Sequence, residues 1–169
     1  MKVYFRLVKG KGFYDRIIRW YSRSDYTHAE FAWPLDSKNP EQWLGAQPKG
    51  GVKIRPKNYL PWNYDLFCVD ISPEQYRGLQ RYVLSQLGKP YDWKAILNMG
   101  VFQHDVTSPK RWFCSELVFG ALGYVGVYLL RAPLSERDRI TPRDLGISVR
   151  AILMRRKGKG ENQGGFTHF

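Results

Sequence analysis

The chain has 169 residues, the size of one ordinary domain, and 43% of them are hydrophobic, which excludes a disordered chain. No run reaches the roughly 18 apolar residues that a membrane-spanning helix needs. The 27 Lys and Arg residues against 15 Asp and Glu give a formal charge of +12. This balance favours binding to a polyanion such as nucleic acid, anionic lipid or an acidic cell-wall polymer, without choosing among them.

The two cysteines, Cys68 and Cys114, lie far apart, and the chain opens without the long apolar stretch of a secretory signal. We therefore expect reduced thiols and a cytoplasmic location, or delivery to the cell envelope by another route, as for a phage-encoded protein. We also expect a single domain over residues 1–154, followed by a basic, flexible tail over residues 155–169.

The first part of the chain has the pattern of a β-meander. Strands are predicted at Val3–Val8, Thr27–Trp33, Gln42–Ala46, Val52–Arg55 and Asp65–Asp70. Between the first two strands, helical spacing predicts a short helix with one apolar face made of Phe13, Ile17, Trp20 and Tyr21. We interpret this face as packing against the core, in preference to a membrane surface.

Helices dominate the second part of the chain. Ser72-Pro-Glu-Gln75 has the chemistry of a helix start and predicts a helix that ends at Gly88. A helix over Tyr91–Met99, a loop over Gly100–Arg111 and a helix from near Cys114 follow. A helical turn at Thr141–Asp144 and a strand at Ser148–Met154 complete the pattern.

Cys114 stands at the predicted start of a helix, where unpaired N–H groups and the macrodipole favour a thiolate. Lys110 and Arg111, just before it, add positive potential. The position therefore indicates a nucleophile. The alternative is a small buried hydrophobic residue, which free cysteines often are.

A cysteine nucleophile needs a base that can protonate the leaving group, and histidine suits this role near neutral pH. His168 is in the predicted tail and His104 in a polar loop, whereas His28 lies on a predicted strand between small residues. The period of two along that strand puts His28 and Glu30 on one face. His28 is therefore the candidate base, and a structural histidine is the alternative.

Five short motifs occur in the order THAEF, GAQPKGGV, KPYDW, FCSELV and ITPRDL, over residues 27–145. This order resembles the circularly permuted, YiiX-like branch of the NlpC-type, papain-like cysteine peptidases and amidases. In the usual order of that superfamily the histidine strand follows the cysteine helix, whereas here His28 precedes Cys114. The resemblance implies an α+β fold, in which an antiparallel β half-barrel packs against helices, with Cys114 and His28 as the catalytic pair.

The resemblance also points to further site residues. Tyr91 matches a tyrosine that lines such sites and helps to stabilise an oxyanion, although it can also be read as an ordinary core aromatic. A polar residue on the strand beside the histidine usually orients the imidazole, but here that position is Gly45. Gln47 on that strand and Glu30 on the histidine strand are the substitutes, and we rank Glu30 first.

The reaction implied is acyl transfer to a thiol: Cys114 attacks an amide carbonyl, His28 protonates the leaving amine, and water hydrolyses the thioester. It requires no metal or other cofactor. The superfamily implies an amide in a peptide or peptidoglycan stem as substrate. One alternative is a lipid acyl hydrolase or acyltransferase similar to lecithin:retinol acyltransferase, for which a membrane surface would be the partner. Another is a non-catalytic basic module that binds nucleic acid, but the sequence has no recognised nucleic-acid-binding motif.

Overall fold

The computed structural model describes residues 1–59, 63–92, 111–132, 134–148 and 150–156. Most of the predicted helix Tyr91–Met99 and of the predicted loop Gly100–Arg111 lies outside the described residues. The same is true of His104, of His168 and of residues 157–169 in the predicted tail.

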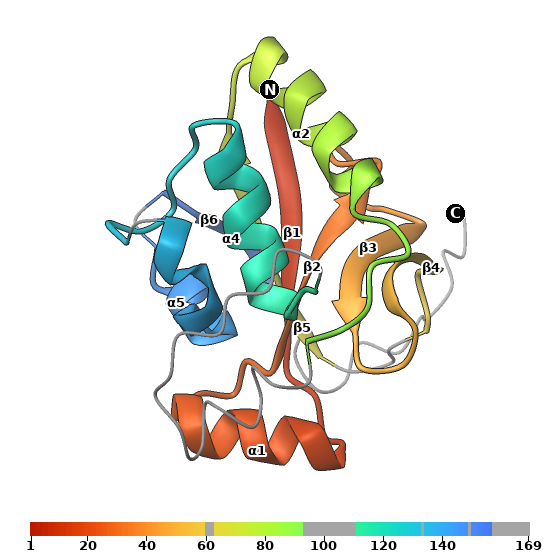
Figure 1. Cartoon of the computed structure of the whole chain (residues 1–169), viewed down its shortest axis with the longest axis vertical. Helices are drawn as coiled ribbons and strands as arrows, with labels where there is room; N and C mark the ends of the chain where they lie inside the picture. The colour runs from red at the N-terminus through yellow and green to blue at the C-terminus, as the bar shows by residue number, and fades with distance from the viewer. Residues whose placement is uncertain (60–62, 93–110, 133, 149, 157–169) are drawn as a thin grey trace, which may run out of the picture.

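Six antiparallel strands form one sheet, in the order β4-β3-β2-β1-β5-β6 (Figure 1). They are β1 (Lys2–Val8), β2 (His28–Trp33), β3 (Gln42–Gln47), β4 (Gly51–Pro56), β5 (Tyr64–Asp70) and β6 (Ile152–Arg156). The bounds of the first five agree with the predicted strands to within one residue. The predicted meander is confirmed for β1 to β4, whereas β5 pairs with β1 instead of following β4. The last strand is shifted, because it covers Ile152–Arg156 instead of Ser148–Met154.

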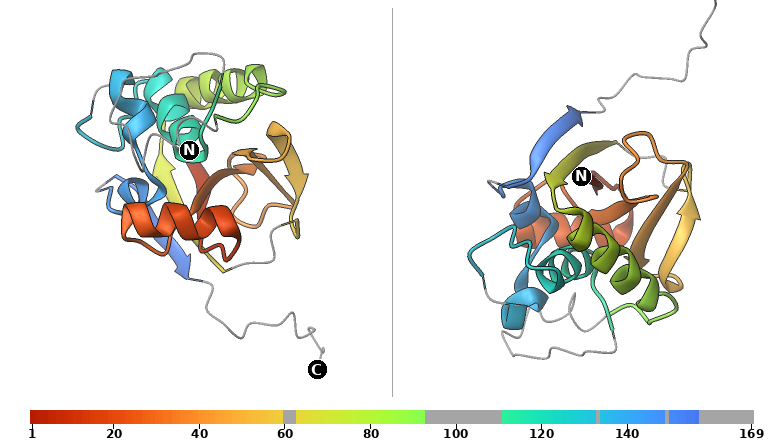
Figure 2. Two further views of the ribbon diagram at one scale, coloured as in Figure 1. Left: turned by 60° about the horizontal axis from the view of Figure 1, so that its bottom comes forward. Right: turned by 90° about the horizontal axis from the view of Figure 1, so that it is seen from above.

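The helical elements are α1 (Phe13–Ser22), α2 (Pro73–Ser85), α4 (Cys114–Tyr124), the 3₁₀ helix η1 (Leu134–Arg139) and α5 (Pro142–Gly146). The sheet curls around α4 and α2, which lie on its inner face (Figure 2). The predicted start of α2 is confirmed, since the Ser72 backbone N–H donates to Gln75 Oε1 at 2.8 Å and the Ser72 hydroxyl accepts from the Gln75 N–H. The regular helix ends at Ser85, short of Gly88, which takes φ +81°.

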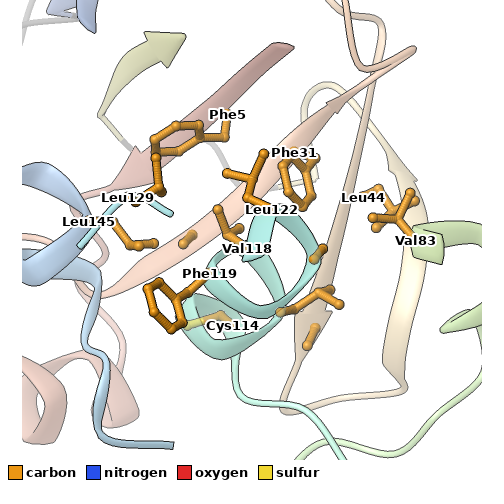
Figure 3. Close-up of a cluster of buried hydrophobic side chains, with 14 of the residues drawn as sticks. Phe5, Phe31, Leu44, Val83, Cys114, Val118, Phe119, Leu122, Leu129 and Leu145 are labelled. Carbon is orange, nitrogen blue, oxygen red and sulfur yellow. The ribbon is translucent and has the colours of Figure 1, made fainter. Parts of the chain in front are cut away.

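Helix α4 runs through the hydrophobic core, and every residue from Cys114 to Gly123 is buried. Figure 3 shows its side chains against those of β1, β2, β3 and α2; the core residues labelled there include Phe5, Phe31, Leu44, Val83 and Leu122. Burying a side chain of this size contributes about 1.5–3 kcal/mol. The core therefore fixes α4, and with it the position of Cys114, against the sheet.

The opposite face of the sheet is also covered in its central part. A second, smaller cluster there consists of Tyr4, Ala32, Trp43, Leu66 and Cys68. Side chains are buried on both faces of β1. A polar side chain of this strand that points to the second face is therefore shielded from water as well.

Helix α1 lies at one end of the sheet, opposite to α2 (Figure 1). It buries Ile18 and Ser22, whereas Phe13 is 72% exposed and Trp20 is 74% exposed. Of the predicted apolar face, Ile17 packs against the core, but the interpretation of this face as core-packing is wrong for its three aromatic residues. The reason lies in the tertiary structure, because α1 contacts the rest of the protein through the side that carries Ile18. No helix among the described residues is long and apolar enough to cross a membrane.

Candidate active site

Cys114 is the first residue of α4 and is fully buried. The start of the helix is fixed by Glu116, whose Oε2 accepts the backbone N–H of Phe113 at 3.1 Å. Arg137 Nε donates to the other oxygen of Glu116 at 2.8 Å. Because the first N–H groups of a helix have no partner within it, the Cys114 side chain sits where positive potential is concentrated.

A hydrogen bond joins the cysteine motif to the last of the five motifs. The Ser115 hydroxyl donates to the carbonyl of Ile140. The next residue, Thr141, caps α5, and its backbone N–H donates to Asp144 Oδ2 at 2.8 Å. FCSELV and ITPRDL therefore form one structural unit that holds the residue next to the nucleophile.

The imidazole of His28 lies between a thiol and a carboxylate. Its Nε2 is 3.0 Å from Glu30 Oε1, and the ring also forms a hydrogen bond with the Cys114 side chain. Since Nε2 faces Glu30, Nδ1 is the nitrogen left for Cys114. The structure thus brings together Cys114, His28 and Glu30, in that order.

Glu30 is held on all sides by hydrogen-bond donors. Arg6 donates to Oε2 twice, from Nε at 2.9 Å and from Nη2 at 2.6 Å. The hydroxyl of Tyr59 donates to Oε1, and Gln47 Nε2 lies 3.5 Å from the same oxygen. The guanidinium of Arg6 also lies 4.1 Å from the centroid of the Trp43 ring. A buried carboxylate is tolerated only with such partners, so this network is what permits the charge of Glu30.

Gly45 explains why the carboxylate comes from the histidine strand. The register Phe31↔Leu44, continued along both strands, puts Gly45 beside Glu30 and Gln47 beside His28. A Cβ at Gly45 would lie 2.7 Å from Glu30 Cγ. The Glu30 side chain therefore occupies the space that a side chain at Gly45 would need. Gln47 reaches the imidazole as well, with its Nε2 at 3.1 Å from His28 Nε2.

Electrostatic interactions favour the charged forms of His28 and Glu30. Burial alone lowers the pKa of His28, but the charges of Glu30 and Cys114 outweigh it and raise that pKa to about 10. Burial alone raises the pKa of Glu30, but His28 and Arg6 outweigh it and lower that pKa to about 2. At neutral pH the site therefore contains an imidazolium, which is the form that stabilises an adjacent thiolate.

A pocket of about 430 Å³ opens beside the imidazole. It is lined by the start of α1, by the turn after β3 and by three of the residues singled out from the sequence, His28, Gln47 and Tyr91. Burial, together with the charge of Cys114, raises the pKa of Tyr91 well above its usual value. The phenol therefore keeps its proton and remains an O–H donor beside the nucleophile.

Sequence reasoning missed two members of the site, Arg6 and Tyr59. Arg6 had a signal, because it is a lone charged residue between apolar neighbours in the middle of a strand. Tyr59 had none, since it follows β4 in an irregular segment and reaches Glu30 only through the fold.

Comparison with models of known protein families gives no match, and comparison with the sequences of curated proteins gives none either. Among solved structures, the metalloprotein YiiX from Escherichia coli superimposes with a TM-score of 0.69 at 19% sequence identity, over 93% of this chain and 97% of that one. At this identity the similarity shows the fold alone. The chain has the predicted YiiX-like, papain-like α+β fold, with an antiparallel sheet packed against helices.

Proposed function

We propose that this protein is a cysteine hydrolase that cleaves an amide bond through a thioester intermediate. The observation that carries the proposal is the placement of His28 between Cys114 and Glu30 in a buried site. A nucleophile, a base and a group that orients the base are the three parts that such chemistry needs.

The reaction proceeds in two steps. The Cys114 sulfur attacks the carbonyl carbon, the C–N bond breaks, and the His28 imidazolium gives its proton to the leaving amine. Neutral His28 then takes a proton from water, the hydroxide attacks the thioester, and the C–S bond breaks to return the Cys114 thiolate and release a carboxylic acid. Glu30 holds Nε2 of His28 throughout, so that Nδ1 stays directed to the sulfur.

The negative charge that develops on the substrate oxygen needs donors. The Tyr91 hydroxyl and the backbone N–H groups at the start of α4 supply them in this proposal. Loss of one such donor typically lowers the rate by about 10² to 10³.

YiiX is described as a metalloprotein, and a metal at the corresponding site of this chain would need several His, Cys, Asp or Glu ligands. Among the described residues, no group of three or more His, Cys, Asp and Glu side chains is arranged to hold a metal ion. The carboxylate nearest to His28 is already bonded by Arg6 and Tyr59. The described residues of this site therefore do not fit a metal, and the proposed steps use none.

Two substrate classes are compatible with this chemistry. The resemblance to NlpC-type enzymes supports an amide in a peptide or peptidoglycan stem. The exposed aromatic face of α1 favours a lipid-derived acyl group as the second candidate, because Phe13, a member of that face, also lines the pocket beside Tyr14.

The test is hydrolysis of both substrate classes by the purified protein, with products identified by mass spectrometry. Peptidoglycan stem peptides and short-chain acyl esters would be compared, with Cys114→Ala as the matched inactive variant. Hydrolysis that requires Cys114 supports the proposal, and the preferred substrate class decides between the candidates. Hydrolysis that persists in Cys114→Ala, or none with either class, would refute it.

A further inference from the structure

The aromatic face of α1 is the feature that the proposed chemistry does not explain. Phe13 and Trp20 are seven residues apart, about two turns of helix, so they project from the same side. Tyr21 lies next to them on the wheel and is 44% exposed, whereas Ile17, also adjacent, is half-buried against the core. Exposed apolar side chains grouped in this way mark an interaction surface.

Basic residues flank this face. Arg16 lies beside Trp20 on the helical wheel, Arg23 is the residue that follows the last turn of α1, and Lys11 comes two residues before the helix; all three are exposed. The nearby acidic groups have local partners, since Asp15 accepts the Gly12 backbone N–H at 2.8 Å and Asp25 lies 3.8 Å from Arg19. The surface therefore combines large aromatic side chains with a net positive charge.

We propose that α1 docks this protein on an anionic phospholipid surface, with Phe13 and Trp20 inserted at the level of the headgroups. The Trp20 indole suits that interface because its ring carries a polar N–H, the Phe13 ring adds apolar surface, and nearby arginines attract anionic headgroups. Docking of a second copy is disfavoured, because each chain carries a formal charge of +12 and two identical basic faces repel.

Docking would also bring the pocket to the lipid surface. Phe13 belongs both to the exposed face and to the lining of the pocket beside His28. The inference does not depend on the chemistry, however, because it concerns α1 alone. A Cys114→Ala variant is therefore expected to bind membranes as the unchanged protein does.

Co-sedimentation with vesicles tests the proposal. Vesicles of phosphatidylcholine alone would be compared with vesicles containing phosphatidylglycerol, at low and at high salt. We expect binding only to the anionic vesicles, weakened by salt. Phe13→Ser/Trp20→Ser should reduce the binding at least tenfold, and Arg16→Gln/Arg23→Gln should reduce it several-fold and flatten its salt dependence.

The controls are Leu84→Ser and Arg81→Gln on α2, at the opposite end of the molecule (Figure 1). Both should bind as the unchanged protein does, and circular dichroism would verify that every variant is folded. Equal binding by the α1 variants and the α2 variants would overturn the proposal, as would no binding to anionic vesicles. Concentration-dependent dimerisation that the Phe13→Ser/Trp20→Ser variant loses would assign the face to a second copy instead.

Discussion

The side chains of His28 and Glu30 meet on one face of β2, with Nε2 of the imidazole 3.0 Å from Oε1 of the carboxylate. Both residues are buried, and Arg6 binds the second carboxylate oxygen. A chain of alternating charges therefore runs from the guanidinium through the carboxylate to the imidazolium and on to Cys114. This arrangement makes the properties of each member depend on its neighbours, which leads to the following predictions.

Cys114 should react with iodoacetamide at neutral pH before Cys68 does. Cys114 lies at the start of α4 beside the positively charged His28, whereas burial raises the pKa of the Cys68 thiol. Mass spectrometry of the alkylated protein would locate the label. Labelling of Cys68 first, or of Cys114 only after unfolding, would show that the nucleophile has been wrongly assigned.

His28→Ala should slow turnover by about 10² to 10⁴, the usual range for loss of a general acid–base. The fold should persist, because Glu30 keeps Arg6 and Tyr59 as partners. Steady-state rates and thermal unfolding, measured on the same preparation, would check both statements. A fully active variant would exclude His28 as the base, and an unfolded one would make it structural.

Glu30→Gln should lower the rate several-fold or more and shift the alkaline limb of the pH–rate profile to lower pH. The reason is that Glu30 raises the pKa of His28, so its loss lets the imidazolium lose its proton earlier. Rates from pH 5 to 11 would measure the shift, because the His28 pKa of about 10 places the alkaline limb of the unchanged protein near that pH. Gln47→Ala should cost less, because Gln47 turns its amide nitrogen, a donor, towards Nε2 of His28, whereas Glu30 accepts the Nε2 proton and supplies the negative charge.

Two results would qualify the comparison of Glu30 and Gln47. Breaking a buried ion pair can cost about 3–5 kcal/mol, so the unfolding of Glu30→Gln must be measured alongside its rate. A near-normal, unshifted profile for Glu30→Gln beside a crippled Gln47→Ala would reverse the ranking of the two residues.

The free energy of unfolding should be highest over a middle range of pH and should fall at both lower and higher pH. The pKa of His28 is raised from 6.5 to about 10, so its contribution is complete below pH 6.5 and is lost as pH rises towards 10. The pKa of Glu30 is lowered from 4.5 to about 2, so its contribution is complete above pH 4.5 and is lost as pH falls towards 2. Urea unfolding across this range should show the alkaline loss, and His28→Ala should diminish it.

Gly45→Ala should damage both stability and rate, because the new Cβ would lie 2.7 Å from Glu30 Cγ. Overpacking of this kind typically costs about 1–3 kcal/mol, and here it would also push the carboxylate away from His28. Gly78→Ala on α2 is the matched control, since the contact its Cβ would make is with one side chain, Val125, at 3.1 Å. Comparable rates for the two variants would show that the position of Glu30 does not depend on Gly45.

The sequence alone determined those features that local periodicity and chain order express. The period of two in β1 to β5 and the capping pair Ser72 and Gln75 predicted elements that the structure confirms. The order of the five motifs predicted the papain-like α+β fold, which the comparison with YiiX also supports. Cys114 was placed at a helix start for the same reason: a helix boundary is encoded by neighbouring residues.

Only the tertiary structure decided the rest. The register between β2 and β3 put Gly45 under Glu30 and Gln47 beside His28, and no local pattern specifies which residues of two strands face each other. Arg6 and Tyr59 come from separate elements and meet Glu30 only in the folded chain. The face of α1 that meets the core was likewise set by packing, because an amphipathic pattern reveals two faces of a helix without saying which one the protein covers.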